Sequence, residues 1–229
     1  MIKVGCFKKS KSEPGFTNVE AVSVSKSGFK VFSPFFLHDE DDIIFENYWQ
    51  FHKVYEEVPD IDIIKDGESI WKHSKEKHIE NGELTSNYFK WREKGMKCQE
   101  PLRYPVGKNY ASKCKFALQY DKKLNYIQSR KEIYLKKYCE LAKKIPLFDY
   151  LKKQLKAKKN LLILDFDGPH QNSLAYYKEK YNVDDNFISN HAMEINQKNI
   201  NIMINDPKHP FGHGYCLALA LLGKEEWAQ

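Results

Sequence analysis

The stretch from Gly214 to Leu222 constrains the fold most, because it contains no charged residue. On a helix it would be apolar on every face, and a helix of that kind is stable only when it is buried. It is much shorter than the roughly 18 apolar residues that a membrane-spanning helix needs. The sequence therefore predicts a buried helix close to its C-terminal end.

The remaining patterns favour an α+β fold that is mainly helical. The continuous apolar run Leu161–Leu164 ends at a turn, which predicts a buried strand. Residues 19–32 are typical of a β-hairpin or of two edge strands, and residues 200–204 fit either a strand or a helix end. Helical spacing and flanking residues predict further helices over 43–58, 84–97, 126–144, 172–181 and 184–196.

The composition is that of an ordinary globular protein. Hydrophobic residues make up 41% of the chain and charged residues 30%, and neither a linker nor an internal repeat divides it. We therefore expect a single compact domain over residues 1–229 with a small sheet. The 5 cysteines are widely spaced and odd in number, which is typical of reduced thiols in an intracellular protein.

Targeting and charge features indicate a cytoplasmic protein with no membrane association. Residues Met1 to Cys6 lack the apolar region of a signal peptide. The net charge of +6 is compatible with a nucleic-acid partner. Nearly all the basic residues are lysines, however, whereas base recognition favours arginine. A solvated lysine surface is therefore the other interpretation.

The segment Phe45–Tyr55 is the first that could carry chemistry. On a helix, Glu46, Gln50 and Lys53 share one face, and aromatic residues such as Trp49 cover most of the remainder. If this polar strip faces water, the segment is an ordinary amphipathic helix. If it lines a cleft, the aromatic walls raise the proton affinity of the carboxylate and suit it to acid–base catalysis.

The second segment, Asn205–Tyr215, leads into the predicted buried helix. Gly212 and Gly214 allow positive φ angles or a close approach of the backbone to a ligand. The N–H groups at the start of the helix would favour a phosphate or another anion. The alternative is a tight turn in which glycine serves the turn geometry alone.

The histidine spacing does not predict a metal site. His209 and His213 are four positions apart, but Pro210 lies between them and they need not share a helical face. We expect His73 and His78 to be solvated.

The pair Asp165 and Asp167 follows the predicted strand, as the catalytic pair does in phosphatases of the DxD type. The continuation Gly168–His170 does not match that motif. A pair of carboxylates at the end of a strand is the simpler interpretation.

The two segments, in this order, resemble the NADAR family. Members carry an aromatic helix with Glu, then Gln, then a nearby Lys, which Glu46–Gln50 and Lys53 match. The family later has an Asp followed by Trp-Gly-x-Gly, and Asp206 and Phe211–Gly214 look like a variant in which Phe replaces the Trp. Phe32–Phe36 is similar to the family's Ser-Asn-aromatic stretch, with Pro in place of Asn.

This resemblance implies a NADAR-like fold, in which residues 60–125 form a family-specific insertion, and an N-glycosidase that uses no metal or redox cofactor. Its substrate would carry an N-glycosidic bond to an ADP-ribosylated base or in a ribosylated nucleotide. Glu46 would stabilise the oxocarbenium-like sugar or activate water, and Asp206 would be the second carboxylate. The implied substrate-binding residues are Trp49, Gln50, Lys53, Phe211, Gly212, His213 and Gly214.

Other classes of function remain open from the residues alone. A non-catalytic nucleotide or nucleic-acid binding module would use the lysine-rich surface and aromatic stacking. A structural or interaction protein would bind no nucleotide at all.

Overall fold

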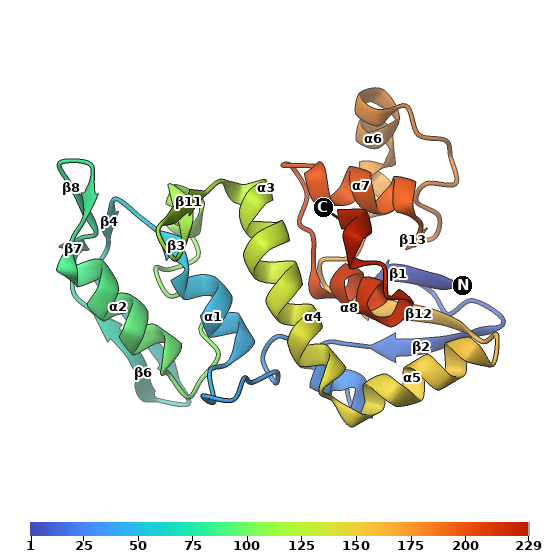
Figure 1. Cartoon of the computed structure of the whole chain (residues 1–229), viewed down its shortest axis with the longest axis horizontal. Coiled ribbons are helices and arrows are strands. Elements are labelled where there is room, and N and C mark those ends of the chain that lie inside the picture. The colour runs from blue at the N-terminus through green and yellow to red at the C-terminus, as the bar shows by residue number, and fades with distance from the viewer. Residues whose placement is uncertain (229) are drawn as a thin grey trace. The chain divides into compact units, whose positions relative to one another are not determined.

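Two compact units make up the protein, whose computed structural model describes residues 1–228 (Figure 1). The first unit joins Met1–Leu37 to the chain from Arg130 onward, and the second is His38–Ser129. Both contain helices and strands, which confirms the predicted mixture of α and β structure. That the units act as a single domain stays a prediction.

A four-stranded sheet organises the first unit. Its strands β1, β12 and β2 run parallel to one another, and β13 pairs antiparallel with β1. Every residue from Leu161 to Asp165 is buried, as expected for a strand covered on both faces. The predicted strand is therefore confirmed. In spatial order the strands are β13 (Ala192–Glu194), β1 (Ile2–Cys6), β12 (Asn160–Asp165) and β2 (Phe16–Glu20).

The predicted buried helix is confirmed as α8 (His213–Leu222). It packs against β1 and β12 and against the helices α4 (Lys136–Lys143) and α5 (Pro146–Lys156) (Figure 1). Its residues from His213 to Leu221 are all buried. Because each large apolar side chain contributes about 1.5–3 kcal/mol when buried, α8 is a major source of stability for this unit.

Two predictions in the first unit were wrong. Residues 29–32, expected in a strand, form the 3₁₀ helix η1 (Gly28–Phe32). Residues 184–196, expected to be helical, form loops and β13, because Asn190 and His191 adopt positive φ angles of 53° and 56° that end any helix. The remaining helical segments of this unit are η3 (Arg130–Leu135), η4 (Gln171–Ser173), α6 (Leu174–Tyr181), α7 (Gln197–Asn205) and η5 (Glu225–Ala228).

The second unit combines short antiparallel strands with the helices α1 (Phe45–Phe51) and α2 (Ser86–Met96). Smaller helical segments are η2 (Ala111–Lys113) and α3 (Tyr126–Ser129). One sheet has the order β11 (Lys122–Leu124), β10 (Phe116–Gln119), β3 (Lys53–Val54). The other strands form pairs: β4 (Glu57–Val58) with β7 (Glu76–Lys77), β5 (Ile61–Lys65) with β6 (Glu68–His73), and β8 (Ile79–Glu80) with β9 (Glu83–Leu84).

The helix predicted over 43–58 is shorter than expected. It ends at Phe51, and Lys53 and Val54 pair instead with Ala117 and Phe116 of β10. This pairing with a distant strand overrides the local helical pattern. The helix predicted over 84–97 is confirmed as α2, and the residues from 126 to 143 are helical throughout, with a π-helical segment at η3. Within residues 1–228, no helix combines the length and apolar character needed to cross a membrane.

An aromatic cluster forms the core of the second unit. The ring of Phe51 lies 4.4 Å from that of Trp91 and 5.1 Å from that of Trp71, measured between centroids. Gly95 of α2 makes this packing possible, because a Cβ there would lie 1.9 Å from a ring atom of Phe51. The glycine therefore brings α2 into close contact with α1.

Replacing Gly95 by alanine should destabilise the protein. Overpacking typically costs about 1–3 kcal/mol, whereas alanine in a helix regains up to about 1 kcal/mol, so we expect a net loss in the free energy of unfolding. Urea denaturation measures it. Gly28→Ala is the control, because its Cβ would meet nothing closer than 3.8 Å. A Gly95→Ala protein as stable as the wild type would contradict the packing described.

Candidate functional site

The polar strip of α1 forms a hydrogen-bonded chain of side chains. The Nε2 atom of Gln50 donates to Oε1 of Glu46 at 2.9 Å, and Nζ of Lys53 donates to Oε1 of Gln50 at 2.8 Å. Glu46 is 7% exposed and Gln50 is 8% exposed. The structure thus brings together three of the predicted site residues, which we call the Glu46 chain. Their burial does not fit a strip that faces open water.

The Glu46 chain ends in a half-buried cation beside an aromatic ring. The ammonium of Lys53 lies 4.8 Å from the centroid of the Trp49 ring, within range of a cation–π interaction. Burial lowers the pKa of Lys53 from its ordinary value, and the nearby Glu46 carboxylate partly counteracts that effect. A carboxylate, an amide, an ammonium and an indole are therefore gathered within one short segment.

Neighbouring polar side chains hold α1 in place. The Nδ2 atom of Asn47 donates to the carbonyl oxygens of Cys98 and Glu100 at 2.8 and 3.0 Å, and its Oδ1 atom accepts from the N–H of Leu102 at 2.7 Å. His52 donates from Nδ1 to the carbonyl oxygen of Tyr48 at 2.6 Å. The bonds of Asn47 hold α1, and hence the Glu46 chain, against the loop after α2.

In the first unit, the start of α8 is bound by a carboxylate of the protein itself. Asp165, at the end of β12, accepts a hydrogen bond from the N–H of Gly214 at 2.8 Å, and its Oδ1 atom lies 3.3 Å from Nδ1 of His213. A Cβ on Gly212 would lie 2.3 Å from Oδ2 of Asp165. Gly212 has a φ of −82°, so close approach to Asp165, and not a positive φ, explains this glycine.

The other predicted binding residues of this segment also have partners inside the unit. Phe211 is 4% exposed and stacks on Tyr215 with 4.9 Å between ring centroids. The Nε2 atom of His213 donates to the carbonyl oxygen of Ala21 at 2.6 Å. Substrate binding by these residues stays a prediction, whereas their packing shows how they build the fold.

Asp206, the second predicted carboxylate, is fully buried in a network of hydroxyl groups. It accepts hydrogen bonds from the hydroxyls of Tyr176 at 2.6 Å and Tyr181 at 3.1 Å and from Nδ1 of His209 at 2.7 Å. Burial alone would raise the pKa of Asp206, but these hydrogen bonds outweigh it and hold the pKa well below its ordinary value. The carboxylate therefore stays ionised, which favours a structural role over proton transfer.

Sequence reasoning missed a small pocket in the first unit. It lies past the carboxyl end of β12, where ligands commonly bind in parallel sheets. The signal was the run of Asp, Gly, Pro and His after the apolar strand, for which we weighed a phosphatase motif and preferred a pair of carboxylates at the end of a strand. Its polar lining includes Asp167, His170, Ser173, Tyr177 and His209. This pocket belongs to the first unit and Glu46 to the second.

The histidines differ from expectation. His73 and His78, expected in solvent, are 9% and 0% exposed. Their neighbours in the sequence are mostly charged, which concealed their burial. His209 and His213 have separate partners, Asp206 and Asp165.

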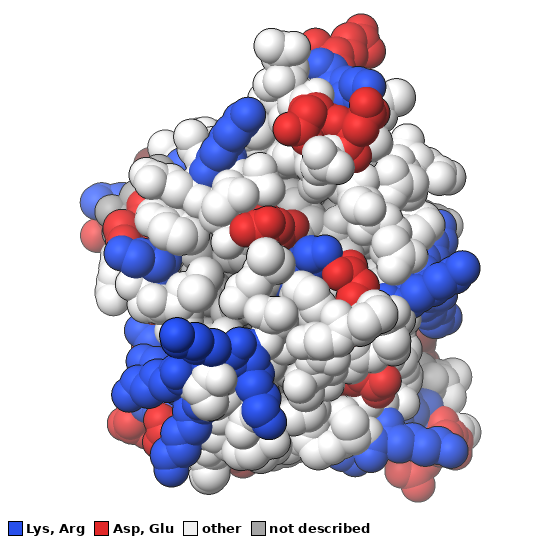
Figure 2. Space-filling model, turned by 90° about the vertical axis from the view of Figure 1, so that its right-hand side faces the viewer, with Lys and Arg blue, Asp and Glu red and all other residues white. Residues whose placement is uncertain are grey.

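Part of the protein surface carries a cluster of basic side chains. Figure 2 shows basic side chains clustered at the lower left of one face, with acidic side chains scattered over the rest of that face and at its lower edge. Along and just after α5, the exposed basic residues are Lys153, Lys156, Lys158 and Lys159.

Comparisons of this chain with models of protein families, with curated proteins and with solved structures found no match. The resemblance to the NADAR family therefore stays a prediction based on the residues of the two segments.

Removing the charge of Asp206 should destabilise the protein. We expect Asp206→Asn to lower the free energy of unfolding by about 2–4 kcal/mol, because buried donors would lose an ionised acceptor. Chemical denaturation measures the change. Asp185→Asn is the matched control, since that side chain is 82% exposed and should shift stability by no more than about 0.5 kcal/mol. Equal effects of the two substitutions would contradict the network.

His52 should make the protein sensitive to acid. Burial, followed by the nearby positive charge of Arg92, lowers the pKa of His52 from 6.5 to about 4. The hydrogen bond to Tyr48 acts in the opposite direction and is outweighed. As the pH falls, the unfolded chain therefore takes up a proton on His52 at a higher pH than the folded protein does. The contribution of His52 to the free energy of unfolding is full above pH 6.5 and is lost as the pH drops toward 4. The loss attributable to His52 is about 3 kcal/mol. Urea unfolding at pH 7 and pH 4.5 should show a smaller loss for His52→Gln than for wild type; an equal loss would refute this assignment.

Proposed function

We propose that the protein hydrolyses the N-glycosidic bond of an ADP-ribosylated base or a ribosylated nucleotide, with Glu46 as the key carboxylate. The observation that carries this proposal is the burial of Glu46, at 7% exposure, in a hydrogen-bonded chain that ends at a cation. The resemblance to the NADAR family, in which the same residues match the motif, supports it. The fold would then be NADAR-like.

The chemistry requires a fixed negative charge beside the sugar. As the bond from the base to the sugar C1 breaks, the electron pair leaves with the base and positive charge develops on the sugar. A carboxylate shielded from water stabilises that charge more strongly than one in bulk solvent. Water then adds to C1, and its proton passes to Glu46 or to the departing base.

The neighbours of Glu46 suit the rest of such a substrate. The hydrogen bond from Gln50 fixes the orientation of the carboxylate. Lys53 offers a positive charge to a phosphate or to the departing base, and its lowered pKa makes it a ready proton donor. The indole of Trp49 offers a surface on which a base can stack.

The 206–214 segment takes a supporting role in this proposal. Asp206 and Gly212–Gly214 are engaged by side chains and backbone of their own unit. We therefore assign the reacting carboxylate to Glu46 alone and treat Asp206 as a residue that positions its surroundings.

Glu46→Gln should abolish turnover while the protein stays folded. Glutamine keeps the size of the side chain and can still pair with Gln50, but it carries no charge to stabilise the sugar. We expect release of ADP-ribose and the unmodified guanine nucleoside from an ADP-ribosylated guanine nucleoside, measured by chromatography, to fall at least about 100-fold. Glu83→Gln, an exposed carboxylate of the same unit, is the control and should retain full activity. Circular dichroism checks the fold of both variants.

Two outcomes would decide against the proposal. A Glu46→Gln protein with wild-type turnover would exclude Glu46 as the key carboxylate. If the wild type released no base but bound DNA or RNA with an affinity that falls steeply with salt, the non-catalytic alternative would hold. The basic cluster in Figure 2 is the observation that favours that alternative.

A further inference from the structure

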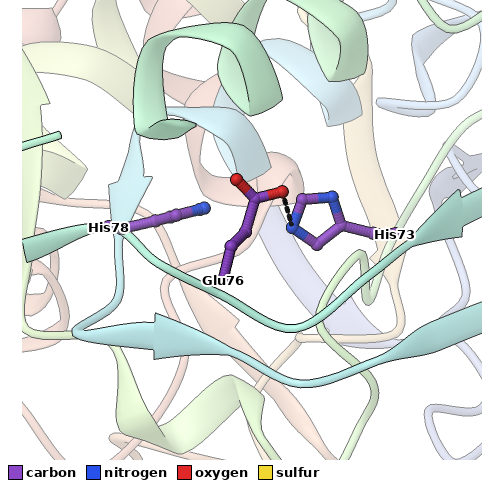
Figure 3. Close-up of side chains that lie close together, drawn as sticks. All are labelled: His73, Glu76 and His78. Atoms are coloured by element: carbon purple, nitrogen blue, oxygen red, sulfur yellow. Dashed lines mark ion pairs between the residues drawn. The ribbon is translucent and has the colours of Figure 1, made fainter. Parts of the chain in front are cut away.

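Three side chains of the second unit converge outside the Glu46 chain. His73 ends β6, Glu76 begins β7, and His78 directly precedes β8. In Figure 3 the carboxylate of Glu76 lies between the two imidazole rings. The Nε2 atom of His73 is 3.0 Å from Oε1 of Glu76, and one ligand atom from each of the three residues lies within 4.8 Å of the others.

The imidazole of His78 is buried without a hydrogen-bond partner. Its side chain is 0% exposed, and neither ring nitrogen makes a hydrogen bond with any residue in the described range 1–228. Burying such a polar group unpaired costs about 1–3 kcal/mol, so a folded protein rarely retains one without a purpose. Two hydrogen bonds hold the backbone of His78 in place. Its N–H donates to the carbonyl oxygen of Glu56 at 2.8 Å, and its carbonyl oxygen accepts from the N–H of Thr85 at 3.0 Å. Moving the ring into solvent would therefore require the backbone at His78 to shift as well.

We propose that His73, Glu76 and His78 bind a divalent transition-metal ion of the zinc class. Two imidazole nitrogens and one carboxylate oxygen are a ligand set that Zn²⁺ commonly uses, with a water molecule completing a tetrahedron. Bonds of about 2.0–2.2 Å place tetrahedral ligands about 3.3 Å apart, so the side chains need to draw inward only slightly. The Glu76 side chain, 28% exposed, has the freedom to do so and opens the site to solvent.

The surroundings suit a metal ion that stabilises structure. The ring of His78 lies 5.0 Å from Trp91 and 5.7 Å from Tyr88, between centroids, and Trp71 stacks beside His73 at 6.4 Å. This aromatic wall shields the two imidazole ligands, so that solvent reaches the ion from the side of Glu76. The three ligands come from segments that pair with different strands, since β6 pairs with β5 and β7 with β4. One ion would cross-link short strands that share few hydrogen bonds.

Zinc binding to the full chain tests the proposal. After removal of metal with a chelator and dialysis, calorimetric titration with Zn²⁺ should show one ion per chain, and thermal unfolding should shift upward by several degrees. Co²⁺, which occupies zinc sites, should give visible absorption bands of a four-coordinate site with nitrogen ligands. Glu76→Gln should weaken Zn²⁺ binding at least tenfold.

Matched variants separate a specific site from surface binding. Glu80→Gln is the control, because that carboxylate is 60% exposed on the adjacent strand, and it should bind Zn²⁺ as the wild type does. His73→Gln should lose the Co²⁺ bands. The partial exposure of Glu76 keeps Glu76→Gln informative even if His78 variants do not fold. Wild type that binds no Zn²⁺, or Glu76→Gln that binds it as tightly as Glu80→Gln, would overturn the proposal.

Discussion

Burial of the Glu46 carboxylate is the constraint on which the account depends. An isolated carboxylate inside a protein costs several kcal/mol, so it stays buried only when other groups compensate its charge. Gln50 donates directly to Glu46, and the half-buried ammonium of Lys53 donates to Gln50 and ends the chain. Asn47 ties α1 to the loop after α2, and Gly95 lets α2 approach α1 closely. The scaffold of the second unit therefore holds the Glu46 carboxyl group at a buried position that water hardly reaches.

The treatment of other buried polar groups separates scaffold from site. Asp165 is bound by the start of α8, and Asp206 is surrounded by hydroxyl groups and His209. Carboxylates with so many internal donors build structure and have little capacity left for a ligand. His78 is the opposite case, since its ring nitrogens lack hydrogen bonds within residues 1–228. The unpaired ring of His78 therefore indicates a site for a ligand, whereas the internal hydrogen bonds of Asp165 and Asp206 indicate a role in the scaffold.

Local patterns were sufficient where a short segment determines its own environment. The apolar composition of α8 and of Leu161–Leu164 requires burial, and helical spacing was enough to place Glu46 beside Gln50. Contacts between distant segments were not predictable in this way. The end of α1 depends on pairing with β10, and the close packing of Gly212 depends on Asp165. The burial of His78 likewise arises from aromatic residues of α2, which no nearby residue signals.

The most direct test of the central claim is a crystal structure of the Glu46→Gln protein with an ADP-ribosylated guanine nucleoside bound. Our account predicts that the sugar C1 lies against the side chain at position 46 and that the base contacts Trp49. A ligand bound instead in the pocket beside Asp167 and His170, with nothing near position 46, would contradict it.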